Sequence, residues 1–144
     1  MEYRKFDGTI YARLDRGDEM IGVITDICRR EKLESAVFSG IGACSSVEIQ
    51  TFDPDRREFE TMTVSGMLEL VSLSGNVITD EDMNYYSHVH AILSYKEDGE
   101  HRMIAGHMKS MTTLYTGEIE IRPVTGGAIK KQFNEETGTA MWKF

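Results

Sequence analysis

An Asp-Gly pair at positions 98 and 99 separates two apolar-rich stretches, and it constrains the fold of this chain more than any other feature. The flanking segments, 87–95 and 101–108, are each expected to be strands. Asp-Gly between two such segments favours a two-residue type I′ turn. The sequence therefore predicts an antiparallel hairpin in which Glu97 pairs with Glu100, and the rest of the register follows by counting outward.

The predicted register places three histidines on one face of this hairpin. Counting outward from the turn, His90 pairs with His107. His88 lies two residues from His90 on the same strand, so both imidazoles project from one face, roughly 7 Å apart. His101 would pair with Lys96 near the turn and is too distant to join them.

A three-residue turn is the alternative, and it would shift the pairing by one residue. Two glutamates facing each other at 97 and 100 are mildly unfavourable. A loop of Glu97-Asp98-Gly99 with a bulge would place His107 on the opposite face of the hairpin. The hypothesis of a shared site therefore predicts the two-residue register, or a compensating bulge further along.

His88, His90 and His107 are candidate metal ligands. A single histidine is usually a hydrogen-bonded surface or core residue. A His-x-His pair with a third histidine at hairpin-compatible spacing, next to the small Gly106, favours a metal site instead. Three neutral imidazoles suit zinc, with cobalt, nickel, iron or manganese as alternatives. Three protein ligands leave one coordination position for water or a substrate oxygen.

The rest of the chain predicts an α+β fold with a mostly antiparallel mixed sheet. One main helix is expected from Asp18 to about Lys32, because apolar residues recur there at helical spacing and Asp18 can serve as the N-cap. Seven or so strands are expected in the segments 9–14, 35–38, 46–52, 58–64, 66–73, 87–95, 101–108 and 112–122. The Gly-rich tail that follows is expected to end in a short edge strand or a docking segment.

Composition argues against several classes of function. The net charge is −8, whereas a protein that binds nucleic acid by neutralising phosphates needs a basic excess, so direct DNA binding is doubtful. No apolar run approaches the roughly 18 residues that cross a bilayer, and the first residues are too polar for a secretory signal. The two cysteines, Cys28 and Cys44, are too few for a disulfide scaffold, which predicts a cytoplasmic protein.

Three other features of the sequence are functional candidates. Glu69 is an acid inside an otherwise apolar strand, where either a solvent-facing position or a role as general acid or base near the metal would explain it. The segment Gly40-Ile41-Gly42 leads into a strand rather than a helix, so a tight backbone crossing is favoured over a phosphate-binding loop. Tyr85-Tyr86-Ser87 could wall a pocket beside the histidines, although packing is the default.

Four segments, in order, resemble the PPC family, the plant and prokaryote conserved domain. They are Tyr11–Asp18, Ser39–Val47, Leu68–Gly75, and His88-Val89-His90 with Gly106-His107. One departure is Ala105-Gly106-His107, where the family commonly has Gly-Gly-His, and this small change leaves the histidine assignment intact. The resemblance implies one compact domain over residues 1–144, with its core at 9–122 and a C-terminal tail at 125–144. It also implies assembly as a homotrimer.

The family resemblance implies two different kinds of role. In land plants an AT-hook before the domain contacts DNA, while the domain supports oligomerisation and partner binding. This chain has no Arg-Gly-Arg-Pro and resembles the free-standing bacterial and archaeal members, which are often labelled DNA-binding. The fold also looks like that of acetolactate decarboxylase, a metal-dependent lyase whose zinc lies on a similar His-x-His and downstream His arrangement. That analogy supports the site more than the reaction.

Two classes of function are therefore expected. The first is a trimeric metal-binding protein with an open coordination position, which could bind a small molecule or act as a metal-dependent, lyase-like enzyme. The second is a DNA-associated regulatory or oligomerisation module that acts through partners. The histidines favour the first class and the family's best-known roles favour the second, and neither identifies a substrate.

Overall fold

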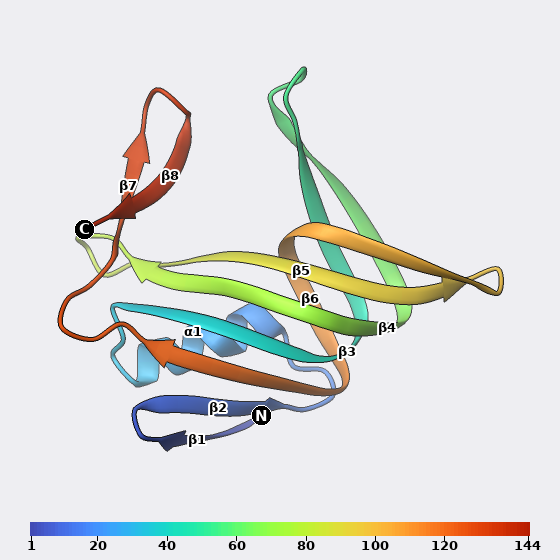
Figure 1. Cartoon of the computed structure of the whole chain (residues 1–144), viewed down its shortest axis with the longest axis horizontal. Helices are drawn as coiled ribbons and strands as arrows, with labels where there is room; N and C mark the ends of the chain where they lie inside the picture. Colours follow the sequence, from blue (N-terminus) through green and yellow to red (C-terminus); the bar gives the residue numbers. More distant parts are fainter.

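The computed structural model describes residues 1–144, and all of its strands belong to one eight-stranded sheet (Figure 1). The strand order is β1-β2-β6-β3-β4-β7-β8, and β5 pairs with both β4 and β6. Every pairing is antiparallel except the one between β4 and β7. The strands are β1 (Glu2–Phe6), β2 (Thr9–Leu14), β3 (Ser35–Asp53), β4 (Glu58–Thr79), β5 (Tyr85–Glu97), β6 (Glu100–Pro123), β7 (Lys130–Asn134) and β8 (Thr139–Lys143). The predicted α+β fold with a mostly antiparallel mixed sheet is confirmed.

The single helix, α1 (Met20–Arg30), packs against β5 and β6. Its buried side chains recur at helical spacing and join the strands' inward side chains in one hydrophobic core. The predicted N-cap was wrong by one residue. The carboxylate of Glu19 caps the helix by accepting the backbone N–H groups of Ile21 and Gly22, at 3.2 and 2.6 Å. Asp18 instead accepts the backbone N–H of Asp15 at 2.8 Å and pairs with the N-terminal amine.

Strands β3 and β4 are longer than the sequence predicted, because the predicted segments 35–38 and 46–52 are both parts of β3, and the segments 58–64 and 66–73 are both parts of β4. β3 continues through Gly40-Ile41-Gly42 with a register shift, and an added Cβ at Gly40 would lie 2.8 Å from the carbonyl oxygen of Glu118. The predicted tight backbone crossing is confirmed. β4 likewise continues through Gly75, where a Cβ would lie 2.6 Å from both the His88 carbonyl oxygen and the Phe38 ring. Glycine marks close packing at these positions rather than a chain reversal.

Besides the β5–β6 hairpin, two further hairpins extend from the body of the protein (Figure 1). One is the arm formed by the end of β3 and the start of β4, joined by a turn at residues 54–57. The other is the C-terminal hairpin, defined here as β7 and β8, which meets the sheet where Lys130 pairs with Thr79. The expected single edge strand is therefore a pair of strands. The helix is too short and too polar to cross a membrane.

Candidate metal centre

Strands β5 and β6 pair from their shared turn as far as His90 and His107, and there they separate. Beyond that point β6 continues alongside β3, where His107 is also the partner of Gln50. His88 lies past the last β5–β6 pair and has a cross-strand neighbour only on β4, which is Asn76. The three histidines therefore lie where the two strands fork.

The two-residue turn that this arrangement requires is present. Glu97 pairs with Glu100 and Lys96 with His101. Asp98 and Gly99 have φ values of 52° and 81°, the positive pair that a type I′ turn needs. Arg102 lies 3.0 Å from the Glu100 carboxylate and 3.8 Å from that of Glu97. This cation offsets the repulsion between the facing glutamates, which was the main argument for the alternative register.

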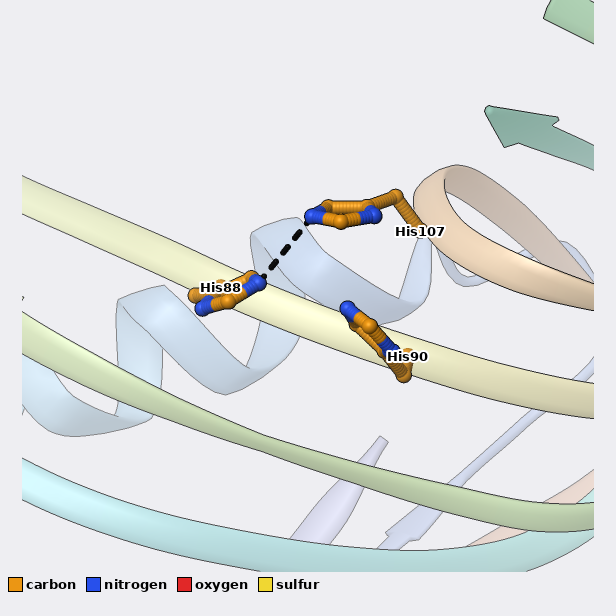
Figure 2. A group of neighbouring side chains, drawn as sticks. All are labelled: His88, His90 and His107. Atoms are coloured by element: carbon orange, nitrogen blue, oxygen red, sulfur yellow. Dashed lines mark hydrogen bonds between the residues drawn. The ribbon is translucent and has the colours of Figure 1, made fainter. Parts of the chain in front are cut away.

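The side chains of His88, His90 and His107 converge (Figure 2). One ring nitrogen from each lies within 4.8 Å of the other two. The Nε2 atoms of His88 and His107 are 3.1 Å apart. Two nitrogens that each lie 2.0–2.1 Å from a tetrahedral zinc are separated by about 3.3 Å. The three residues thus fit a divalent metal in both donor chemistry and spacing, and His101 takes no part.

Burial lowers the pKa of both His88 and His107. For His88 the larger cause is desolvation and the smaller is the charge of His90. For His107 desolvation again comes first, followed by the charges of His90 and His88. A lowered pKa keeps both imidazoles neutral at pH 7, and the neutral form is the one that binds metal.

His107 is held in place by the close approach of β6 to β3. At Gly106, where φ is +156°, an added Cβ would lie 2.8 Å from both the Gln50 carbonyl oxygen and Ile49 Cγ2. Only glycine fits this crossing without strain. On the arm, the Phe59 ring contacts the His107 ring edge-on, with centroids 5.3 Å apart. The position of the His107 side chain is therefore determined by a backbone crossing and an aromatic contact, neither of which the β5–β6 hairpin alone provides.

Glu69 lies elsewhere on the sheet. It is exposed on β4, opposite Ser94 and Ala43, and it does not belong to the histidine group. Ser74 is the β4 residue opposite His90, so Glu69 lies roughly 15 Å further along that strand. This position favours the solvent-facing interpretation within one chain, and a role in catalysis stays a prediction.

The two cysteines are free, buried and separate from the histidines. Burial raises the pKa of the Cys28 thiol to about 12 and that of Cys44 to about 11. Thiols with such raised pKa values are poor nucleophiles and poor metal ligands at neutral pH. Their role is packing in the core.

Sequence reasoning missed several residues beside the site. Asn76 is the cross-strand neighbour of His88, and Lys131 and Trp142 from the C-terminal hairpin line a cavity that His88 and His107 also line. Asn76 was hidden because Ser74-Gly75-Asn76 resembles a strand end. The hairpin carries no local signal that would dock it there. Of the segment Tyr85-Tyr86-Ser87, which the sequence offered as a possible pocket wall, Tyr86 and Ser87 line this cavity, whereas Tyr85 packs against the hydrophobic core.

Fold and site together define an α+β protein with a three-histidine group that could hold a metal ion. The model of the Plants and Prokaryotes Conserved (PCC) domain family matches residues 1–125. The chain belongs to this family, which is the one that its motifs resemble. No curated protein matches the chain.

Solved structures with the same fold carry different descriptions. A metal-containing protein from Archaeoglobus fulgidus is 30% identical, with a TM-score of 0.81 over 99% of this chain and 96% of that one. A "putative dna binding protein" from Bacteroides thetaiotaomicron is 21% identical, with a TM-score of 0.88 over 99% and 96%. Alpha-acetolactate decarboxylase from Bacillus subtilis is 14% identical, with a TM-score of 0.57 over 80% of this chain and 52% of the enzyme.

Proposed function

We propose that this protein binds one divalent metal ion per chain, zinc foremost, through His88, His90 and His107. The observation that carries the proposal is the convergence of three ring nitrogens within 4.8 Å at the fork between β5 and β6. The metal-containing relative at 30% identity supports it. Zinc bound by three histidines keeps a position at which it can polarise the oxygen of a small molecule.

The chain's own residues suit such a site. His90 and His107 are fixed as a directly opposed cross-strand pair, and His88 reaches the same face from two residues away. The neutral state of His88 and His107 at pH 7 leaves their nitrogens free to bind the ion without first losing a proton. This arrangement supports small-molecule binding, and lyase-like activity is the corresponding enzymatic hypothesis. Glu69, the candidate general acid or base from the sequence, lies too far along β4 to serve the histidines of its own chain.

The proposal includes assembly as a homotrimer, as the family resemblance implies. Large apolar side chains stand exposed on outward positions of several strands, among them Tyr11 at 48%, Ile41 at 55% and Val71 at 49%. Exposed apolar groups of this kind are typical of surfaces that other protein chains cover. Sedimentation equilibrium should give three times the monomer mass of 16.3 kDa, and a monomer at micromolar concentration would contradict the trimer.

Metal analysis of untagged protein tests the site. The parent should retain about one zinc per chain after exhaustive dialysis, and His107→Ala should retain less than a tenth of that. The matched control is His101→Ala, which removes an exposed histidine of the same hairpin that lies outside the group. Sub-stoichiometric metal in the parent, unchanged in His107→Ala, would remove the basis of the proposal.

A DNA-associated role is the second candidate, because a relative with the same fold carries that description. The net charge of −8 opposes direct binding to duplex DNA. A gel-shift titration over a range of salt concentrations tests whether the protein binds duplex DNA directly. Tight binding at moderate ionic strength would contradict the charge argument, whereas weak binding that vanishes at low added salt would support it.

The predicted single domain over residues 1–144 is also a proposal, supported by the one continuous sheet. Limited proteolysis should leave the β1–β6 body and the C-terminal hairpin uncut under conditions that digest unfolded chain. Early release of a fragment beginning near residue 126 would show instead that the tail is a separate unit.

A further inference from the structure

A cavity of about 260 Å³ lies between the start of β5 and the C-terminal hairpin. Thr79 pairs with Tyr85 of β5 and with Lys130 of β7, so the hairpin begins next to β5 (Figure 1). His88 and His107 line this cavity together with residues of both hairpin strands. A small molecule in the cavity therefore lies against the candidate metal site and the hairpin at once.

The charge of the cavity is opposite in sign to that of the whole chain. The chain carries 24 acidic side chains against 16 lysines and arginines. No aspartate or glutamate lines the cavity, however, and Lys131 is the one lysine or arginine that does. Neutral histidines add no negative charge to a divalent ion. With the metal bound, the cavity thus holds only positive charge, and such a space favours an anion.

Lys131 is half-buried and has no ion-pair partner, unlike the two other lysines of the hairpin. Lys130 lies 2.6 Å from the Glu34 carboxylate. Lys143 lies 2.9 Å from the Glu81 carboxylate. Lys131 is therefore the lysine of the hairpin whose charge is available to a ligand.

The contacts of Lys131 hold its ammonium group at the cavity without neutralising it. The ammonium nitrogen lies 3.3 Å from the centroid of the Tyr86 ring, which also lines the cavity. An aromatic face occupies one side of an ammonium group and leaves N–H donors on the others. The Tyr86 hydroxyl donates to Asp80 at 3.0 Å. This carboxylate also accepts three hydrogen bonds from Asp82 and Asn84, so its acceptor positions are filled.

The hairpin places an apolar surface beside this charge. Lys131 and Trp142 are directly opposed on β7 and β8, and both line the cavity. Directly opposed residues of an antiparallel pair lie on the same face, with side chains close enough to touch one ligand. Met141 lines the cavity as well. A ligand that pairs with Lys131 can therefore pack its carbon atoms against Trp142 and Met141.

We propose that this cavity binds a small organic carboxylate whose counterion is Lys131, and this inference rests on the proposed metal site. The carboxylate accepts hydrogen bonds from the Lys131 ammonium group, and a metal ion in the same cavity adds to the attraction. The short carbon chain of the ligand contacts the hairpin. The volume of about 260 Å³ is just below the roughly 300–1,000 Å³ of sites for drug-sized ligands, which limits the ligand to a smaller molecule.

The fluorescence of Trp142, the single tryptophan of the chain, reports binding next to Lys131. Zinc-loaded protein is titrated with butanoate and with butanamide, which has nearly the same shape but no charge. We expect butanoate to bind at least about tenfold more tightly, because a charged acceptor strengthens the hydrogen bond from an ammonium group. Butanoate that binds no more tightly than butanamide, or that does not bind, would overturn the proposal.

Variants of the hairpin lysines test the assigned contact. Lys131→Met should weaken butanoate binding at least about tenfold and leave the affinity for butanamide unchanged, whereas Lys131→Arg, which keeps the charge, should bind butanoate more tightly than Lys131→Met does. Lys143→Met is the matched control, because it removes a lysine of the same hairpin that does not line the cavity, and it should bind as the parent does. Thermal melting of each variant establishes that it is folded. Parent-like binding of butanoate by Lys131→Met would contradict the proposal.

Calorimetric titration with zinc separates this inference from the proposed function. If the parent and Lys131→Met bind zinc equally but neither prefers butanoate to butanamide, the carboxylate site fails and the metal site stands. If the parent does not bind zinc, the proposed function fails and this inference fails with it. Equal zinc binding by the two proteins, with a preference for butanoate in the parent alone, is the expected result.

Discussion

Strand β5 presents Val89, Ala91 and Leu93 to the hydrophobic core, all at most 3% exposed, and His88, His90 and Ile92 to the opposite face. Both sets alternate along the same six residues, 88–93, so they share one backbone and one register. The inward set packs with α1 and the other strands. In the outward set, His88 and His90 converge with His107 of β6, and His88 also lines the cavity next to the C-terminal hairpin.

The contrast shows that one register can serve stability and chemistry at once. A slip of a single residue would expose the apolar set and bury the histidines. The burial of Val89, Ala91 and Leu93 therefore specifies the positions of His88 and His90 without any contact between the two sets. Substitutions on the inward face should change the free energy of unfolding, and those on the outward face should change metal affinity.

Leu93→Ala should have the largest effect. Leu93 is 0% exposed, and truncating a buried leucine costs about 2–5 kcal/mol of unfolding free energy. Urea denaturation of the metal-free protein measures it, while metal content at 20 °C should stay close to that of the parent. A loss below about 1 kcal/mol would show that this face of β5 is not part of the core.

His90→Ala should leave metal-free stability within about 0.5 kcal/mol of the parent, because the side chain is exposed. Zinc affinity should fall by more than about 100-fold, equivalent to about 2.7 kcal/mol. Competition with a zinc chelator gives the affinity, and Ile92→Ala, on the same face but outside the group, is the control. Equal affinity for zinc in His90→Ala and Ile92→Ala would break the contrast between the two faces.

Gly106→Ala should lower both the free energy of unfolding and the affinity for zinc. The added Cβ would lie 2.8 Å from the Gln50 carbonyl oxygen, so β6 must shift away from β3 and carry His107 with it. We expect a loss of about 1–3 kcal/mol in unfolding free energy, as for other overpacked sites, together with weaker zinc binding. Gly127→Ala, with no atom within 4 Å of the new Cβ, is the matched control. Destabilisation without any change in zinc affinity would mean that the crossing does not position His107.

Acid should produce a smaller, graded effect. The pKa values of His88 and His107 lie below the ordinary value of 6.5 in the folded metal-free protein, so unfolded chain binds protons before folded chain does. Metal-free stability should therefore fall as pH drops below about 6.5, and zinc affinity should fall with it because protons compete for the nitrogens. Zinc affinity that is constant between pH 7.5 and 5 would contradict histidine ligation.

Local patterns in the sequence predicted the grouping of the three histidines well. Asp98-Gly99 determined the turn, counting from it paired His90 with His107, and the two-residue spacing placed His88 on the same face. The pairing of β5 with β6 was predictable because hairpin register depends on neighbours in sequence. The one uncertainty in this register was the repulsion between Glu97 and Glu100. Arg102, two residues beyond Glu100, offsets that repulsion.

Long-range packing was harder to predict. Gly40 and Gly75 resemble turn residues, and only the positions of β6 and Phe38 show that they relieve close contacts within strands. The helix cap shifted from Asp18 to Glu19 because the N-terminal amine, distant in sequence, holds Asp18. Asn76 and Lys131 lie beside His88 because of the placement of β4 and of the C-terminal hairpin, which no local pattern in the sequence determines.

X-ray absorption at the zinc edge tests the central claim most directly. The three-histidine site predicts three nitrogen neighbours at about 2.0–2.1 Å, with the outer-shell scattering of imidazole rings and one further light atom. His107→Ala should lose this signature. Sulfur scattering at about 2.3 Å, or a shell of oxygen alone in the parent, would contradict the account.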